Sequence, residues 1–196
     1  MSKSIIIAPA ERYILEVTFD KPGTYNLMNK NPSKSYVLGD ILVKPSTNQY
    51  SPTETPIPKI TDYTAYLNKK PDYEFRLTLK MPAMEMPHVE EQKGIEWEDT
   101  MFNMNRAHHN KLITWIIEDT KSKKQNMDVM PDVALGTVKK IRFINDKKSD
   151  HPMQHPIHLH GQRFLVLAEN GLVNPHQGWK DTVLVPAGST IDILVE

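Results

Sequence analysis

The sequence of 196 residues contains no cysteine, which excludes disulfide bonds, thiol catalysis and thiolate metal sites within the chain. Its 24 basic residues are balanced by 24 acidic ones, so it lacks the positive excess that binds nucleic acid or an anionic membrane surface. Long hydrophobic runs are also lacking, because the apolar run at residues 5–10 is far shorter than the roughly 20 residues of a membrane span. We therefore expect neither a nucleic-acid partner nor a membrane span.

Helical periodicity is hard to find, and glycine (8) is scarce beside proline (15). The chain instead contains short runs rich in Val, Ile, Tyr, Phe and Thr, separated by turn residues. This pattern predicts an all-β chain folded as a β-sandwich. The expected strands are residues 12–19 paired with 24–28 through a turn at 21–23, and then 36–43, 73–80, 138–145, 163–168, 181–185 and 190–195.

A proline-rich segment separates two parts of the chain. Residues 44–72 carry four prolines among Ser, Thr and Asn in their first half, which is the composition of a linker, and we expect a mostly extended chain as far as about residue 66. The predicted organisation is therefore a first part at residues 1–43, a linker at 44–72 and a domain at 73–196. Within that domain, residues 81–106 are rich in Met and acidic side chains and are expected to be irregular.

Four of the eight histidines lie within residues 151–161 (HPMQHPIHLHG). Because side chains alternate along a strand, His158 and His160 should project to one side and His155 to the other. Neutral imidazoles are good ligands for copper, zinc and iron. A lone histidine is usually an ordinary surface or core residue, but three at this spacing, between Pro, Ile and Leu, favour a metal site.

The cluster also carries a specific resemblance. Residues 155–161 (HPIHLHG) resemble the first copper motif of the C-terminal cupredoxin domain of multicopper oxidases, the family of laccases, ascorbate oxidase and bacterial copper-resistance oxidases. Further similarities to that family lie at residues 8–13, 22–25, 141–146, 162–167 and 179–195. The resemblance implies a cupredoxin-like Greek-key β-sandwich, incomplete at both ends: residues 1–43 would be the last strands of the middle domain, and 73–196 a C-terminal domain lacking its final strands.

The resemblance implies copper as the cofactor. His155 would bind the type 1 copper, His158 the type 2 copper and His160 one type 3 copper. The complete enzyme would oxidise a reducing substrate, such as a phenol or a metal ion, in one-electron steps at the type 1 site and reduce dioxygen to water at the trinuclear cluster. It would act in the periplasm or outside the cell.

The chain holds only part of that copper machinery. The family's second C-terminal motif, with its cysteine, and the paired histidines of its N-terminal domain do not occur in this sequence. We therefore expect the chain alone to be inactive and to need the missing N-terminal cupredoxin domain as its partner. The edges exposed by truncation also favour self-association.

A second candidate copper site lies in the Met-rich segment. Thioethers and an imidazole are soft ligands suited to Cu(I), although Met-rich loops more often serve packing. The residues of this accessory site are Met81, Met84, Met86 and His88, and a looser group is formed by Met101, Met104, His108 and His109.

The remaining polar candidates favour simpler roles. His151 and Met153 are expected in a loop rather than as ligands, and His176 in an exposed turn. Asp181 either orients an imidazole or makes a hydrogen bond at the start of a strand. Residues 11–12 (ER) are expected in a surface or inter-domain contact. Two rival functions also stay open: a non-catalytic copper-binding module for storage or delivery, and a purely structural β-sandwich.

Overall fold

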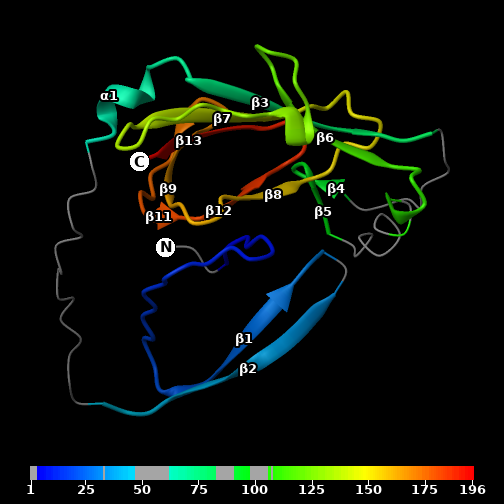
Figure 1. Ribbon diagram of the computed structural model, residues 1–196. Helices are drawn as coiled ribbons and strands as arrows, with labels where there is room; N and C mark the ends of the chain where they lie inside the picture. Colours follow the sequence, from blue (N-terminus) through cyan, green and yellow to red (C-terminus); the bar gives the residue numbers. More distant parts are fainter. Residues whose placement is uncertain (1–3, 33, 47–61, 83–90, 98–105, 107) are drawn as a thin grey trace. The chain divides into compact units, whose positions relative to one another are not determined.

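The computed structural model describes residues 4–32, 34–46, 62–82, 91–97, 106 and 108–196. Its regular structure is almost entirely β-strand, which confirms the all-β prediction (Figure 1). The elements are β1 (Gly23–Lys30), β2 (Ser35–Val43), α1 (Thr64–Leu67), β3 (Tyr73–Lys80), β4 (Glu91–Gln92), β5 (Ile95–Glu96), β6 (Thr114–Asp119), η1 (Asn126–Asp128), β7 (Lys139–Asn145), β8 (His155–His158), β9 (Phe164–Glu169), β10 (Leu172–Val173), β11 (Trp179–Lys180), β12 (Thr182–Val185) and β13 (Thr190–Val195). Contacts divide the chain into two compact units: Met1–Arg12 with Ile60–Glu196, and Tyr13–Lys59.

The smaller unit is built on the antiparallel pair β1 and β2, whose register shifts between Leu27 and Met28. The predicted strand at residues 12–19 is wrong, because no strand is assigned there and β1 takes β2 as its partner instead. An extended apolar segment becomes a strand only when a neighbour satisfies its backbone groups. Here the segment leaves side chains such as Ile14 fully exposed.

The larger unit contains a seven-stranded sheet with the order β10-β9-β13-β7-β3-β6, and β11 also pairs with β9. Its strands pair antiparallel except for β3 and β7, which run parallel. The register places Ile193 of β13 opposite Ile141 of β7 and Val166 of β9. A separate two-stranded sheet is formed by β8 and β12.

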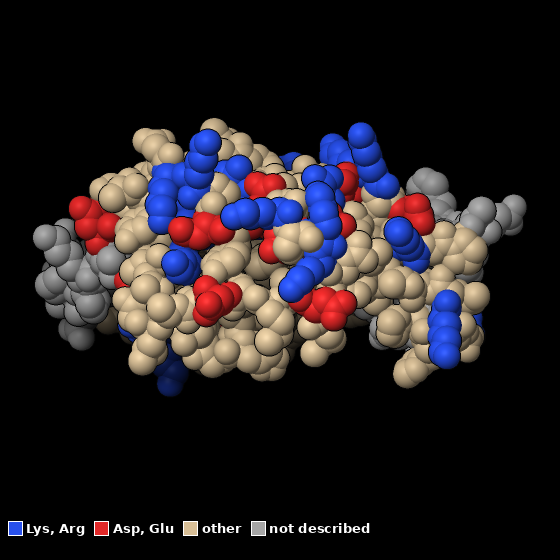
Figure 2. Space-filling model, turned by 45° about the horizontal axis from the view of Figure 1, so that its top comes forward, with Lys and Arg blue, Asp and Glu red and all other residues tan. Residues whose placement is uncertain are grey.

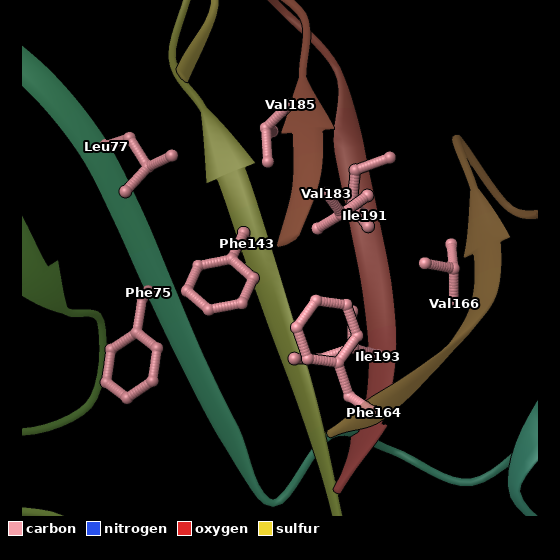
Figure 3. Close-up of a cluster of buried hydrophobic side chains, with 9 residues drawn as sticks. All are labelled: Phe75, Leu77, Phe143, Phe164, Val166, Val183, Val185, Ile191 and Ile193. Atoms are coloured by element: carbon pink, nitrogen blue, oxygen red, sulfur yellow. The ribbon is translucent and has the colours of Figure 1, made fainter. Parts of the chain in front are cut away.

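The main core lies between the seven-stranded sheet and the β8–β12 pair. Alternate residues of each strand point to one face, so β3, β7, β9 and β13 each contribute one set of side chains, and β12 contributes the opposing set. Figure 3 shows these side chains pointing toward one another: Phe75, Leu77, Phe143, Phe164, Val166, Val183, Val185, Ile191 and Ile193. Ile157 of β8 packs against the same cluster. This two-layer arrangement is the predicted sandwich.

Part of the opposite face of the large sheet is covered by α1 and the residues around it. Leu165, Leu167 and Leu194 form a second buried cluster, against which Tyr66 and Leu67 of α1 pack. The prediction of an extended chain as far as about residue 66 is therefore wrong for the start of this helix. Apolar side chains that can be buried on the sheet favour a helical turn there, and the backbone N–H of Thr64 donates to Asp62 (3.1 Å) just before it.

A buried ionic network fastens α1 to the sheet. The Lys140 ammonium, with the side chain 2% exposed, lies 3.1 Å from a carboxylate oxygen of Asp192 and donates to the carbonyls of Tyr66 (3.0 Å) and Leu67 (2.9 Å). Arg142 donates two hydrogen bonds to the same carboxylate, at 2.7 and 2.9 Å. The network thus joins α1, β7 and β13 through one buried carboxylate.

Charges are mixed rather than segregated on the molecular surface that Figure 2 shows, where basic and acidic side chains alternate over the same face. Among the residues that the structure describes, no helix is long and apolar enough to cross a membrane.

Candidate metal site

The histidine cluster lies on β8 and the turn after it. β8 pairs antiparallel with β12, so that His155 stands opposite Val185 and His158 opposite Thr182. The strand ends at His158, and His160 follows in a turn in which Gly161 adopts a positive φ of 71°. Residues 155 and 158 have opposite parity in the strand, as the sequence predicts.

His155 lies on the inner side of the β8–β12 pair. Its ring meets the Trp115 ring edge-on, with centroids 5.7 Å apart. Burial lowers the pKa of His155 to about 4, because the charged imidazolium is disfavoured away from water. The imidazole is therefore neutral at neutral pH and keeps a lone pair on one ring nitrogen, as a metal ligand requires.

His158 and His160 face each other on the other side. Their ring centroids are 4.8 Å apart and the rings are nearly perpendicular. Two imidazoles at this separation can present their nitrogens to the same small region, as ligands of one metal centre do. The side chain of His158 is 38% exposed, so this pair is more open to solvent than the half-buried His155.

A series of polar contacts links the ring of His158 to Thr182, Asp181 and Arg12. Nδ1 of His158 lies 2.9 Å from the hydroxyl oxygen of Thr182, and that hydroxyl donates to Oδ1 of Asp181 at 3.0 Å. Arg12 forms an ion pair with the same carboxylate. Desolvation raises the pKa of Asp181, but the hydrogen bonds from Arg12 and Thr182 together lower it by more than desolvation raises it. Its pKa therefore lies below the ordinary value, and the carboxyl is ionised at neutral pH.

The outer side of Asp181 borders a small cavity of about 160 Å³. Its lining residues are Arg12, Arg163, Trp179, Lys180, Asp181 and Thr182. The Arg163 guanidinium lies 4.3 Å from the centroid of the Trp179 ring. Lys180 pairs with Glu11 at 2.5 Å, so the predicted contact of residues 11–12 consists of two ion pairs with neighbouring residues of the larger unit.

The Met-rich candidate is described only in part. Met81 packs beside the buried cluster of Leu79, Ile113 and Met153, which is the packing role. The other members of the group, Met84, Met86 and His88, lie outside the described residues. In the looser group, Nδ1 of His108 lies 3.2 Å from the carbonyl oxygen of Ile113 and His109 is exposed, whereas Met101 and Met104 lie outside the described residues.

The other histidines lie apart from the cluster. Nε2 of His151 lies 2.7 Å from a carboxylate oxygen of Glu96, in a loop as predicted. His176 is exposed in the segment before β11, also as predicted.

The cluster fits part of a copper site. Its imidazoles are nitrogen donors of the type that copper accepts, and one of them is held neutral by burial. Among the residues that the structure describes, however, no group of three or more His, Cys, Asp or Glu side chains could hold a metal ion. A full coordination sphere would need donors from other residues.

Sequence reasoning missed the two side chains that contact the cluster most directly. Thr182 reaches His158 only because the two residues are opposite in the β8–β12 register. Trp115 reaches His155 from β6, about forty residues earlier in the chain. Asp181, next to Thr182, was the one signal in the sequence of a group able to orient an imidazole.

The fold and the cluster together define the class of protein: a β-sandwich whose smaller sheet presents imidazoles suited to a metal on two faces. The family model for multicopper oxidases matches residues 67–196, which is more than half of the chain. The chain therefore belongs to the multicopper oxidase family.

One solved structure agrees with this assignment at the level of the fold. The chain is similar to a multicopper oxidase from Campylobacter jejuni, described as a metallo-oxidase, with a TM-score of 0.54 and 18% sequence identity over 90% of this chain and 35% of that one. A second structure, the multicopper oxidase mgLAC, gives a TM-score of 0.37 and 20% identity over 67% of this chain and 35% of that one. No curated protein sequence matches the chain. The first likeness shows the cupredoxin-like fold, and the chain spans about a third of the length of either structure, 35%.

Proposed function

We propose that the chain is part of a copper-dependent oxidase in which His155 binds the type 1 copper, His158 the type 2 copper and His160 one type 3 copper. In this proposal residues 1–43 belong to the middle cupredoxin domain, 44–72 form the linker and 73–196 belong to the C-terminal domain. Bound copper would supply the redox chemistry, by which a reducing substrate is oxidised and dioxygen is reduced to water. The whole enzyme would work in the periplasm or outside the cell.

One observation carries the proposal: β8 and the turn after it present the histidines in two different surroundings. His155 is desolvated and rests against Trp115, whereas His158 and His160 form an exposed pair. An electron-accepting site and an oxygen-reducing site need separate ligands a short distance apart, and the placement of these histidines on β8 and the following turn supports such a division. The role of this chain's own residues is to hold neutral imidazoles at those two places.

The chain alone is proposed to lack turnover, because it contains no cysteine to provide a thiolate for a type 1 site. The test is to add Cu(II) to the 196-residue chain and record its visible absorption, its copper stoichiometry and its oxidation of a phenol. We expect weak binding, no intense blue band and no oxidation. A blue band or turnover would contradict this part of the proposal.

Variants separate the histidine pair from adventitious binding. His158→Ala and His160→Ala should each weaken copper binding, whereas His176→Ala should not, because His176 is an exposed residue outside the cluster. If all three changes reduce binding equally, the cluster is no specific site. Tight binding of copper without oxidase activity in any longer form of the protein would favour the storage or delivery alternative.

A further inference from the structure

The Thr182 hydroxyl contacts two side chains at once, and it can donate a hydrogen bond to only one of them. Its oxygen lies 3.0 Å from Oδ1 of Asp181 and 2.9 Å from Nδ1 of His158. A hydroxyl carries one proton to donate, and its oxygen can accept as well. If the hydroxyl donates its hydrogen bond to one neighbour, the other neighbour must therefore donate a hydrogen bond to the hydroxyl oxygen.

Asp181 accepts the hydrogen bond that the Thr182 hydroxyl donates. An ionised carboxylate can only accept hydrogen bonds, and the Arg12 guanidinium beside it favours the ionised form. Since the Thr182 proton points at Asp181, the hydroxyl can offer only a lone pair to His158. Nδ1 of His158 must then carry the hydrogen of that contact, which leaves the lone pair of the neutral ring on Nε2.

The hydroxyl cannot be bypassed in this geometry. The carboxylate oxygen Oδ1 of Asp181 lies 4.0 Å from Nδ1 of His158, which is too far for a hydrogen bond. Thr182 is only 1% exposed and is fixed opposite His158 by the β8–β12 register. Its hydroxyl is therefore held between the two side chains rather than free to turn to solvent.

We propose that Thr182 is a positioning residue which, held by Asp181, fixes His158 in the Nδ1–H tautomer and so directs the Nε2 lone pair toward a metal. The nitrogen that binds a metal is set by the hydrogen bond that the other nitrogen makes. The use of this lone pair by copper rests on the proposed function, but the tautomer does not, because it is a property of the metal-free chain.

His160 provides an internal reference. It belongs to the same cluster and its ring lies edge-on to the His158 ring, yet in the part of the chain that the structure describes its ring nitrogens have no hydrogen-bond partner. An imidazole without such a partner favours the Nε2–H tautomer in water. The two histidines should therefore differ in tautomer although they are only two residues apart.

The test is NMR of the full 196-residue chain, free of metal and labelled with ¹⁵N-histidine, at about pH 9, well above the ordinary pKa of an imidazole. Long-range ¹H–¹⁵N spectra identify the protonated nitrogen of each ring, and His158→Gln assigns the signals of His158. Thr182→Val removes the hydroxyl at nearly constant shape, and Thr182→Ser restores it. Thr190→Val makes the same change on β13, away from the cluster, as the matched control.

We expect His158 to be mainly Nδ1–H in the wild-type chain and in Thr182→Ser. Thr182→Val should change the tautomer ratio at least about five-fold toward Nε2–H, which is the effect of one hydrogen bond of about 1 kcal/mol. Thr190→Val should change nothing, and His160 should stay constant in all variants. A wild-type His158 that is mainly Nε2–H, or a folded Thr182→Val with an unchanged ratio, overturns the inference. If Thr182→Val does not fold, the wild-type spectrum still decides.

Adding Cu(II) to the wild-type chain separates this inference from the proposed function. Paramagnetic broadening of His158 and His160, with His176 spared, supports the metal role. An Nδ1–H tautomer without such broadening would leave the positioning inference intact and remove the proposed type 2 and type 3 ligands.

Discussion

The buried carboxylate of Asp192 offers the strongest single test of what holds this fold together. Asp192→Asn keeps the shape of the side chain and removes its charge. The Lys140 ammonium, 2% exposed, would then be held by the carbonyls of Tyr66 and Leu67 without a counter-ion. Arg142 is one-third exposed and can turn to water, so the cost arises mainly at Lys140.

The expected loss of stability follows from the burial of Lys140, which cannot turn to water as Arg142 can. Removing one partner of a buried ion pair leaves an uncompensated charge and costs about 3–5 kcal/mol. Domains have a total unfolding free energy of about 5–15 kcal/mol, so the variant should be visibly destabilised or partly unfolded. Urea unfolding followed by tryptophan fluorescence and circular dichroism measures the difference. Asp132→Asn, which changes an exposed carboxylate of the same unit, is the matched control and should change nothing measurable.

The effect should also depend on pH in a defined direction. Desolvation raises the pKa of Asp192, but hydrogen bonds from Arg142 and Lys140 lower it more, so its pKa in the folded state is below the ordinary value. Its contribution is then fully present above the unfolded pKa of about 3.9 and is lost as the pH falls through the folded pKa. The gap between wild type and Asp192→Asn should be constant near neutral pH and narrow in acid. A loss below about 1 kcal/mol at pH 7, or a gap that widens in acid, would refute the reasoning.

Two further changes test the packing around the site, both by urea unfolding. Phe164→Ala deletes a ring that is fully buried in the main core and should cost about 3–5 kcal/mol, as aromatic truncations in cores do; a loss under 1 kcal/mol would show that the sandwich core is not packed as described. Gly94→Ala would place a Cβ 2.5 Å from the carbonyl oxygen of Ala187 at a positive φ of 76°, whereas Gly171→Ala meets only the positive φ of 79° with open space around it. Both variants should show the strain of about 1–2 kcal/mol expected for a left-handed residue, with a further loss in Gly94→Ala alone; equal losses would contradict the close approach at Gly94.

Five of the longer strands of the larger unit, β3, β7, β9, β12 and β13, could be predicted because their signal is local. Period-two alternation predicted residues 73–80, and a short run rich in apolar residues predicted 190–195; these are the bounds of β3 and β13. The strand at residues 12–19 failed for a reason the local pattern does not contain: alternation marks a segment that can be a strand, but a partner decides whether it is one. β1 found that partner in β2 instead.

The metal cluster was predictable in one respect and not in another. The parity of His155 against His158 follows from sequence spacing alone. The partners of these rings do not, because Trp115 and Thr182 approach through strand pairings that join distant parts of the chain. The burial of Lys140 could not be predicted either, because a lysine in a strand is expected to face solvent unless another element, here α1, covers it.

The two faces of β8 control their imidazoles by different physical means. On the inner face His155 is kept neutral by desolvation, which lowers its pKa to about 4 but does not choose which nitrogen carries the proton. On the outer face His158 is exposed, so water would leave its tautomer to the preference of the free ring, and the contact with Thr182 supplies the choice. A ligand needs both a neutral ring and a lone pair on the correct nitrogen. It follows that a change at Thr182 should alter the nitrogen that His158 presents and leave the protonation of His155 untouched. Trp115→Leu, which removes the ring against His155, should alter the protonation of His155 and leave the tautomer of His158 unchanged.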